Sequence, residues 1–146
     1  MSPVTAGYKL FTPLTLGKDL VLKNRVVMSP LTRARSETEK HLPNDMNVEY
    51  YDQRTGCGLI ISEASAISPQ VFGWYGAAAL YNEEQVLGWK KITDAVHAKD
   101  GKIFPQLWHM GRQAHSSFNE PESPPTGRQA SCPHLDTPLQ GQQQDD

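Results

Sequence analysis

The sequence is poor in cysteine and has no long apolar run. Its 146 residues include two cysteines, Cys57 and Cys132, so no disulfide framework is expected, and neither stands in a metal-ligand spacing. The apolar run of residues 59–61 is far shorter than the roughly 20 residues that a membrane-spanning helix needs. No basic segment followed by an apolar one opens the chain, so no secretory signal is expected. These absences predict a cytoplasmic protein without a metal site.

An excess of charge of one sign is also lacking. The formal net charge is -2, from 14 basic and 16 acidic residues. A balance this close to neutral creates no general field that would attract nucleic acid or an anionic membrane. The composition therefore gives no reason to expect either as a partner.

The composition divides the chain into two parts. Residues 119–146 hold five of the 11 prolines, end in a run of glutamine and aspartate, and contain no aromatic residue. Their only large aliphatic side chains are Leu135 and Leu139. Such a segment buries too little to offset the entropy lost on ordering. We therefore predict an ordered part up to about residue 118 and a disordered Pro/Gln-rich tail over residues 119–146.

Strands are expected at four places in the ordered part. Residues 14–16 and 20–22 alternate around Gly17 and Lys18, which predicts a small hairpin. Short strands are expected at residues 25–28, 59–63 and 103–108. The near-continuous apolar run at 59–63 suits a strand buried on both faces, as in a parallel sheet.

Two helices are expected between these strands. One begins at Asn44 and ends near residue 56, and the other begins at Asn82 and ends near residue 99, with Gln85 completing a capping box. The second helix carries an apolar stripe of Val86, Trp89, Ile92 and Val96. The alternation of strands and helices predicts an α/β fold with parallel strands. Periodicity alone does not choose between a doubly wound sheet and a (β/α)₈ barrel.

Four motifs decide between these folds. They are LFTPL at residues 10–14 with NRVVMSPLTR at 24–33, YYDQR at 50–54, SEA at 62–64 and QLWHMGR at 106–112. In this order and at about this spacing, they resemble the N-terminal part of the old yellow enzyme family. The resemblance implies a TIM barrel that is incomplete here, with an N-terminal hairpin and about three βα units. It also implies an oxidoreductase that uses FMN and takes its hydride from NADPH to reduce alkenes activated by a carbonyl or nitro group.

The resemblance also implies which residues meet the cofactor and the substrate. Flavin contacts are expected from Pro30, Leu31, Thr32, Ala64 and Gln106. Thr32 would place its hydroxyl against the carbonyl edge of the flavin, and Gln106 would offer its amide as both donor and acceptor. Trp108 matches a position that shapes the substrate pocket. Trp74 lies in the loop where relatives often have a substrate-facing tyrosine.

Without the resemblance these residues have plainer interpretations. Thr32 after a strand is typical of a turn or a helix cap. Gln106 in an apolar strand is unusual, because a buried amide needs hydrogen-bond partners. Trp108 and Trp74 could be core or surface aromatic residues, and for Trp74 this interpretation is favoured over a role at the substrate.

The length suggests that the barrel is not complete. A (β/α)₈ barrel typically needs about 250 residues, and the substrate-binding, proton-donating and phosphate-binding groups of the family have no counterparts in this sequence. No catalytic residue is therefore assigned, and we expect a truncated chain that is inactive alone. The alternative is a non-catalytic barrel fragment that associates with itself, as a homo-oligomer, or with a full-length relative. A different α/β protein is disfavoured, because no glycine-rich phosphate loop follows a strand.

Overall fold

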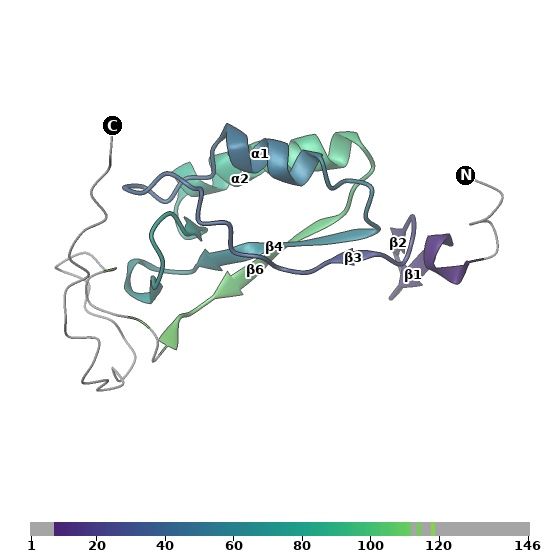
Figure 1. The fold of residues 1–146 in the computed structure, drawn as a ribbon, viewed down its shortest axis with the longest axis horizontal. Coiled ribbons are helices and arrows are strands. Elements are labelled where there is room, and N and C mark those ends of the chain that lie inside the picture. The colour runs from purple at the N-terminus through teal and green to yellow at the C-terminus, as the bar shows by residue number, and fades with distance from the viewer. Residues whose placement is uncertain (1–7, 112–113, 115–117, 119–146) are drawn as a thin grey trace, which may run out of the picture.

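The N-terminal hairpin forms where the sequence predicts it. The computed structural model describes residues 8–111, 114 and 118. After a 3₁₀ helix (Lys9–Phe11), β1 (Leu14–Leu16) pairs antiparallel with β2 (Leu20–Leu22). Gly17 adopts a φ of +63° in the turn, which glycine reaches without steric cost. In Figure 1 this hairpin lies at one end of the molecule, away from the helices.

A parallel sheet forms around β4 (Leu59–Ala66). Its partners are β3 (Val27–Met28), β5 (Ala78–Ala79) and β6 (Ile103–Trp108). Ile60 pairs with both Met28 and Ile103, and Ser65 pairs with both β5 and β6. β3 and β5 therefore share one edge of β4, and β6 occupies the other. The parallel α/β architecture predicted from the alternation is confirmed.

Both helices begin at the predicted capping residues. Asn44 caps α1 (Asp45–Asp52), and Asn82 caps α2 (Glu83–Ala98). In each capping box the asparagine side chain accepts from the first turn, and the side chain of Asn47 or Gln85 accepts from the amide of the cap. Both helices lie on the same face of the sheet (Figure 1).

The core fills the space between the sheet and these helices. Its buried members are Tyr51, Ile60, Ala78, Trp89, Ile92 and Val96. Val86 does not belong to it, because 46% of this residue is exposed, which corrects the predicted stripe. Gln85 takes the inward place in the first turn, since its side chain accepts from the amides of Tyr81 and Asn82.

The opposite face of the sheet is open within the described residues. Val27 and Phe104 are 49% and 48% exposed there, and Leu59 and Ile61 are only half-buried. The expectation that residues 59–63 are buried on both faces is therefore wrong for this structure. Around these residues only the helix side of the sheet is covered, whereas Ala64 and Ala66, nearer the carboxyl end of β4, are buried.

Two strand boundaries differ from the prediction, and one short strand was not predicted. The strand expected at 25–28 is only Val27–Met28, because the Arg25 amide donates to the Leu10 carbonyl and the Val26 amide to Asn24 Oδ1. β4 runs on to Ala66, since β6 pairs with it to the end. β5 was not predicted, because its two small residues carry little strand signal.

The proposed tail, residues 119–146, lies outside the described residues. No helix in the described part of the chain is long and apolar enough to cross a membrane.

Candidate functional site

The carboxyl ends of the parallel strands bring together most of the predicted site residues. Ala64 is the register partner of Gln106, and Ala66 is the partner of Trp108. Register partners in a parallel pair point to the same face of the sheet. Ala64 and Gln106 therefore lie side by side. Ala64 is buried, whereas Gln106 and Trp108 are half-buried.

An irregularity in the pairing sets which side chains reach this site. Ile61 pairs with Phe104 and Ala64 pairs with Gln106, so Ser62 and Glu63 together oppose only Pro105. This is the arrangement of a β-bulge. Within the bulge the Gln106 amide donates to Ser62 Oγ at 3.3 Å. The bulge keeps Ala64 on the open face and turns Glu63 toward the helices.

The Gln106 side chain leaves its hydrogen-bonding capacity open. Phe104 and Gln106 lie on the face away from α2, because the alternate residues Ile103 and Pro105 line a pocket against that helix. Among the described residues, none forms a hydrogen bond with the Gln106 side-chain amide, although its own backbone is engaged. A half-buried amide with both a donor and an acceptor suits a planar ligand whose edge carries both kinds of group. These features fit the flavin ring that the resemblance implies.

The loop after β3 approaches the same end of the sheet. The Arg33 amide donates to Glu63 Oε2 at 2.9 Å, which ties the residue after Thr32 to the strand position before Ala64. Pro30 is half-buried, Leu31 is 53% exposed and Thr32 is exposed. The three predicted loop contacts thus lie close to the carboxyl half of β4, with surface to offer a ligand.

Trp74 lies in the loop between a 3₁₀ helix (Pro69–Val71) and β5. The residue is 53% exposed, and among the described residues its ring makes no aromatic contact with Trp108. The same loop lies against the residue Met110 just after β6, because the Met110 amide donates to the Val71 carbonyl and its side chain packs at Gly73. Trp74 therefore lies at the same end of the sheet as Trp108, but the structure does not bring the two rings together.

Glu63 is a central residue to which the sequence analysis assigned no role. It is 1% exposed, and its carboxylate accepts from Asn47 Nδ2 at 3.2 Å and from the Tyr51 hydroxyl at 3.3 Å, as well as from Arg33. The Tyr51 oxygen in turn accepts from the Glu63 amide at 2.7 Å. Burial, reinforced by the Glu63 charge, raises the pKa of Tyr51, so its hydroxyl stays protonated and donates. Two features of the sequence could have predicted this network. A glutamate stands inside an apolar strand, and Asn47 and Tyr51, four residues apart, share one face of a helix.

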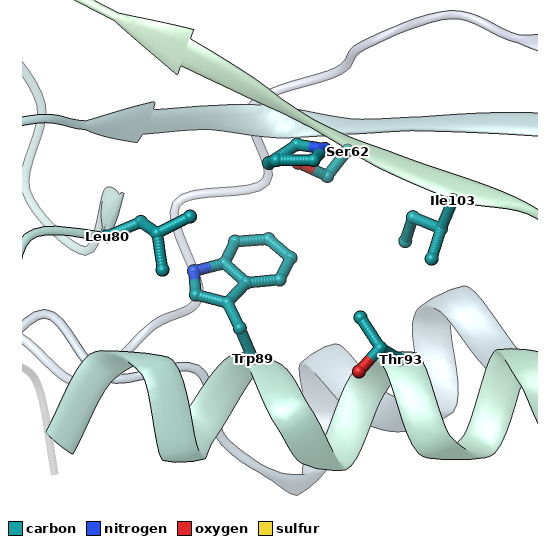
Figure 2. A pocket seen from close by; sticks show the side chains of 6 residues that line it. Ser62, Leu80, Trp89, Thr93 and Ile103 are labelled. Carbon is teal, nitrogen blue, oxygen red and sulfur yellow. The ribbon is translucent and has the colours of Figure 1, made fainter. Parts of the chain in front are cut away.

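A small pocket between α2 and the sheet is separate from this site. Its volume is about 100 Å³, and its lining is mostly apolar. Figure 2 shows Trp89 and Thr93 of α2 facing Ser62, Leu80 and Ile103 across it. It offers no convergent polar groups for a cofactor. In the described ranges no three histidine, cysteine or acidic side chains gather as a metal site would require.

Comparison with known proteins agrees with the geometry. Residues 9–144 match the NADH:flavin oxidoreductase / NADH oxidase family, so the match runs past residue 118, the predicted end of the ordered part. Flavin oxidoreductase hxnT of Emericella nidulans is 47% identical over 113 residues, which are 75% of this chain and 29% of that protein.

Solved structures show the same relationship. The old yellow enzyme homologue from Zymomonas mobilis is 46% identical with a TM-score of 0.72, covering 76% of this chain and 31% of its own. Morphinone reductase in complex with tetrahydroNAD is also 46% identical with a TM-score of 0.72, covering 77% and 30%. The chain thus spans less than a third of the length of these relatives. It belongs to the NADH:flavin oxidoreductase / NADH oxidase family, the FMN- and NAD(P)H-dependent oxidoreductases that include the old yellow enzymes.

Proposed function

We propose that this chain is the N-terminal part of an FMN-binding (β/α)₈ barrel, made of the hairpin and about three βα units. The complete barrel would take a hydride from NADPH and reduce the C=C bond of a small-molecule alkene activated by a carbonyl or nitro group. Its location would be cytoplasmic. The observation that carries the proposal is the pairing of Ala64 with Gln106 next to the loop that holds Thr32. Among the described residues, none forms a hydrogen bond with the side-chain amide of this glutamine.

The proposed flavin contacts divide the recognition of FMN among three strand ends. When bound, FMN supplies the redox chemistry, and the protein tunes and orients it. Gln106 would hydrogen-bond the polar edge of the ring with its amide oxygen and nitrogen. Thr32 would donate its hydroxyl to a flavin carbonyl, and Pro30 and Leu31 would contact the ring through the main chain. Ala64 has only a methyl group, so it would let the ring approach the strand closely.

The two tryptophans would shape the substrate side of the site. Trp108 follows Gln106 by two residues on the same strand face, so its half-buried ring would line the space above the flavin. Trp74 would approach the substrate from the neighbouring loop. A flat apolar ring suits an alkene conjugated to a carbonyl, because it contacts both without competing for hydrogen bonds.

We further propose that residues 1–146 alone do not reduce alkenes. The chain corresponds to 29–31% of its relatives, and a barrel needs about 250 residues to close. The exposed Val27 and Phe104 on the open face support this proposal, because the interior of a closed barrel is filled by such side chains.

The test is to purify the chain and record its visible spectrum with its gel-filtration profile. Bound flavin in a discrete species would support the site, and enone-dependent NADPH oxidation would then defeat the proposed inactivity. Gln106→Leu should reduce flavin content strongly, whereas Gln53→Leu on the exposed end of α1 should not. Equal flavin content in both variants would overturn the role of Gln106.

A second candidate function rests on the uncovered surfaces. Leu107 is 61% exposed and Phe104 48%, and among the described strands β6 has a partner on one edge only. Such an edge pairs readily with another chain. The unpaired edge of β6 therefore favours a non-catalytic role, in which the fragment binds a second copy of itself or a full-length relative. It predicts a stable dimer or co-purifying relative that Phe104→Glu dissociates, and a well-behaved colourless monomer would exclude it.

A further inference from the structure

The residue after Thr32 is held at two points. The Arg33 amide donates to Glu63 Oε2 at 2.9 Å. Its guanidinium carbon lies 5.2 Å from the centre of the Tyr50 ring, within range for a cation–π contact. Thr32 and Leu31 are exposed. The anchor at Arg33 therefore restrains a segment that is otherwise lightly packed.

The directions of the hydrogen bonds around Glu63 require a carboxylate. Asn47 must present its NH₂ group, because its Oδ1 accepts from the Asn44 amide in the capping box at 3.0 Å. Tyr51 must direct its proton to Glu63, because its oxygen accepts from the Glu63 amide. With the Arg33 amide, three donors converge on two oxygens. A carboxylate accepts all three hydrogen bonds. A glutamine would place its own NH₂ donor against either the Arg33 amide or the Asn47 and Tyr51 donors.

We propose that Glu63 is a positioning residue that fixes Arg33 and thereby sets the place of the Thr32 hydroxyl at the flavin. This inference rests on the proposed function, since it needs a flavin facing Thr32. Burying a carboxylate is costly unless it is well hydrogen-bonded. Among the described residues that donate to the Glu63 carboxylate, Arg33 alone lies outside α1. These hydrogen bonds thus fix the loop to the helix and to the strand.

The test compares Glu63→Gln with Glu49→Gln in this chain. Glu49 lies exposed on α1 and accepts only from Gln53 among the described residues, so the same substitution there leaves the network intact. Amide hydrogen exchange of Arg33 is measured without flavin, with the Ile60 amide, which donates to the Lys102 carbonyl, as the reference. We expect Glu63→Gln to accelerate exchange at Arg33 by about tenfold or more beyond any change at Ile60. Equal acceleration at both amides would show a merely structural role and would overturn the inference.

The flavin potential gives the second readout. Loss of the Thr32 hydroxyl in Thr32→Ala should lower the potential, because a donor to the flavin carbonyl stabilises negative charge on the reduced ring. Glu63→Gln should shift it in the same direction, and the double variant should shift it no further than Thr32→Ala. An unchanged potential in Glu63→Gln, or additive shifts, would overturn the inference. If the unmodified chain binds no flavin, residues 1–146 alone do not form the proposed flavin site, while exchange at Arg33 still decides whether Glu63 anchors the loop.

Discussion

Replacing Tyr51 by phenylalanine removes one buried oxygen from the middle of the Glu63 network. Tyr51 is 0% exposed, and its hydroxyl makes two hydrogen bonds. The 2.7 Å bond satisfies the Glu63 amide, and an amide left buried without a partner costs about 1–3 kcal/mol. The donation to the carboxylate is worth about 1.5–3 kcal/mol more, reduced here by its longer distance of 3.3 Å. We expect Tyr51→Phe to lower the free energy of unfolding by about 3 kcal/mol.

The assay is urea unfolding followed by fluorescence, with Tyr50→Phe as the control. Tyr50 is the neighbouring residue on the helix, is half-buried, and has no hydrogen bond from its hydroxyl among the described residues. Its ring contacts the guanidinium groups of Arg33 and Arg54, and phenylalanine keeps that contact. Tyr50→Phe should therefore cost less than about 0.5 kcal/mol. If the two variants lose the same stability, the two hydrogen bonds of the Tyr51 hydroxyl with Glu63 do not stabilise the fold.

Three further predictions concern stability. Burial raises the pKa of Tyr51, so above about pH 10 the unfolded chain releases this proton while the folded chain keeps it, and stability falls as the pH rises. Tyr51→Phe should remove up to about 1.4 kcal/mol per pH unit from this alkaline loss in urea titrations, and identical slopes would contradict the assignment. A Cβ on Gly58 would lie 1.9 Å from the Asn24 carbonyl oxygen, so Gly58→Ala should lower the free energy of unfolding by about 3 kcal/mol in the same assay. A Cβ on Gly56 would have nothing within 4 Å, so Gly56→Ala should lower it by less than about 0.5 kcal/mol. Asn82→Ala should cost about 1 kcal/mol through loss of the α2 cap, and no change in its urea midpoint would refute the capping role.

The helices and the long strands could be predicted because their signals are local. Asn44 and Asn82 mark the two helix starts, with Gln85 three residues after Asn82, and both helices form with capping boxes. The extent of β3 could not be predicted in this way. The amides of Arg25 and Val26, just before it, donate to the Leu10 carbonyl and to the Asn24 side chain, and the strand pattern of these residues signals neither partner.

The candidate site was predictable only as a set of positions. The rule that parallel strands present their chemistry at their carboxyl ends places Ala64, Gln106 and Trp108 at one end of the sheet, and the register agrees. Their roles toward a flavin stay predictions. The tie between Arg33 and Glu63 was not predictable, because no periodicity links a loop amide to a side chain 30 residues away.

One β-bulge connects the strand chemistry to the site. In a regular strand, Glu63 would share the face of Ile61, and a carboxylate would stand on the open face beside Gln106. In the bulge two residues of β4 lie opposite Pro105, and the next register pair is Ala64 with Gln106. The extra residue exchanges a charged side chain for a methyl group where close approach of a flavin is proposed. It also delivers the displaced carboxylate to Asn47 and Tyr51, from where it holds the loop that carries Thr32. A single extra residue in β4 thus shapes both the surface of the site and the anchor behind it.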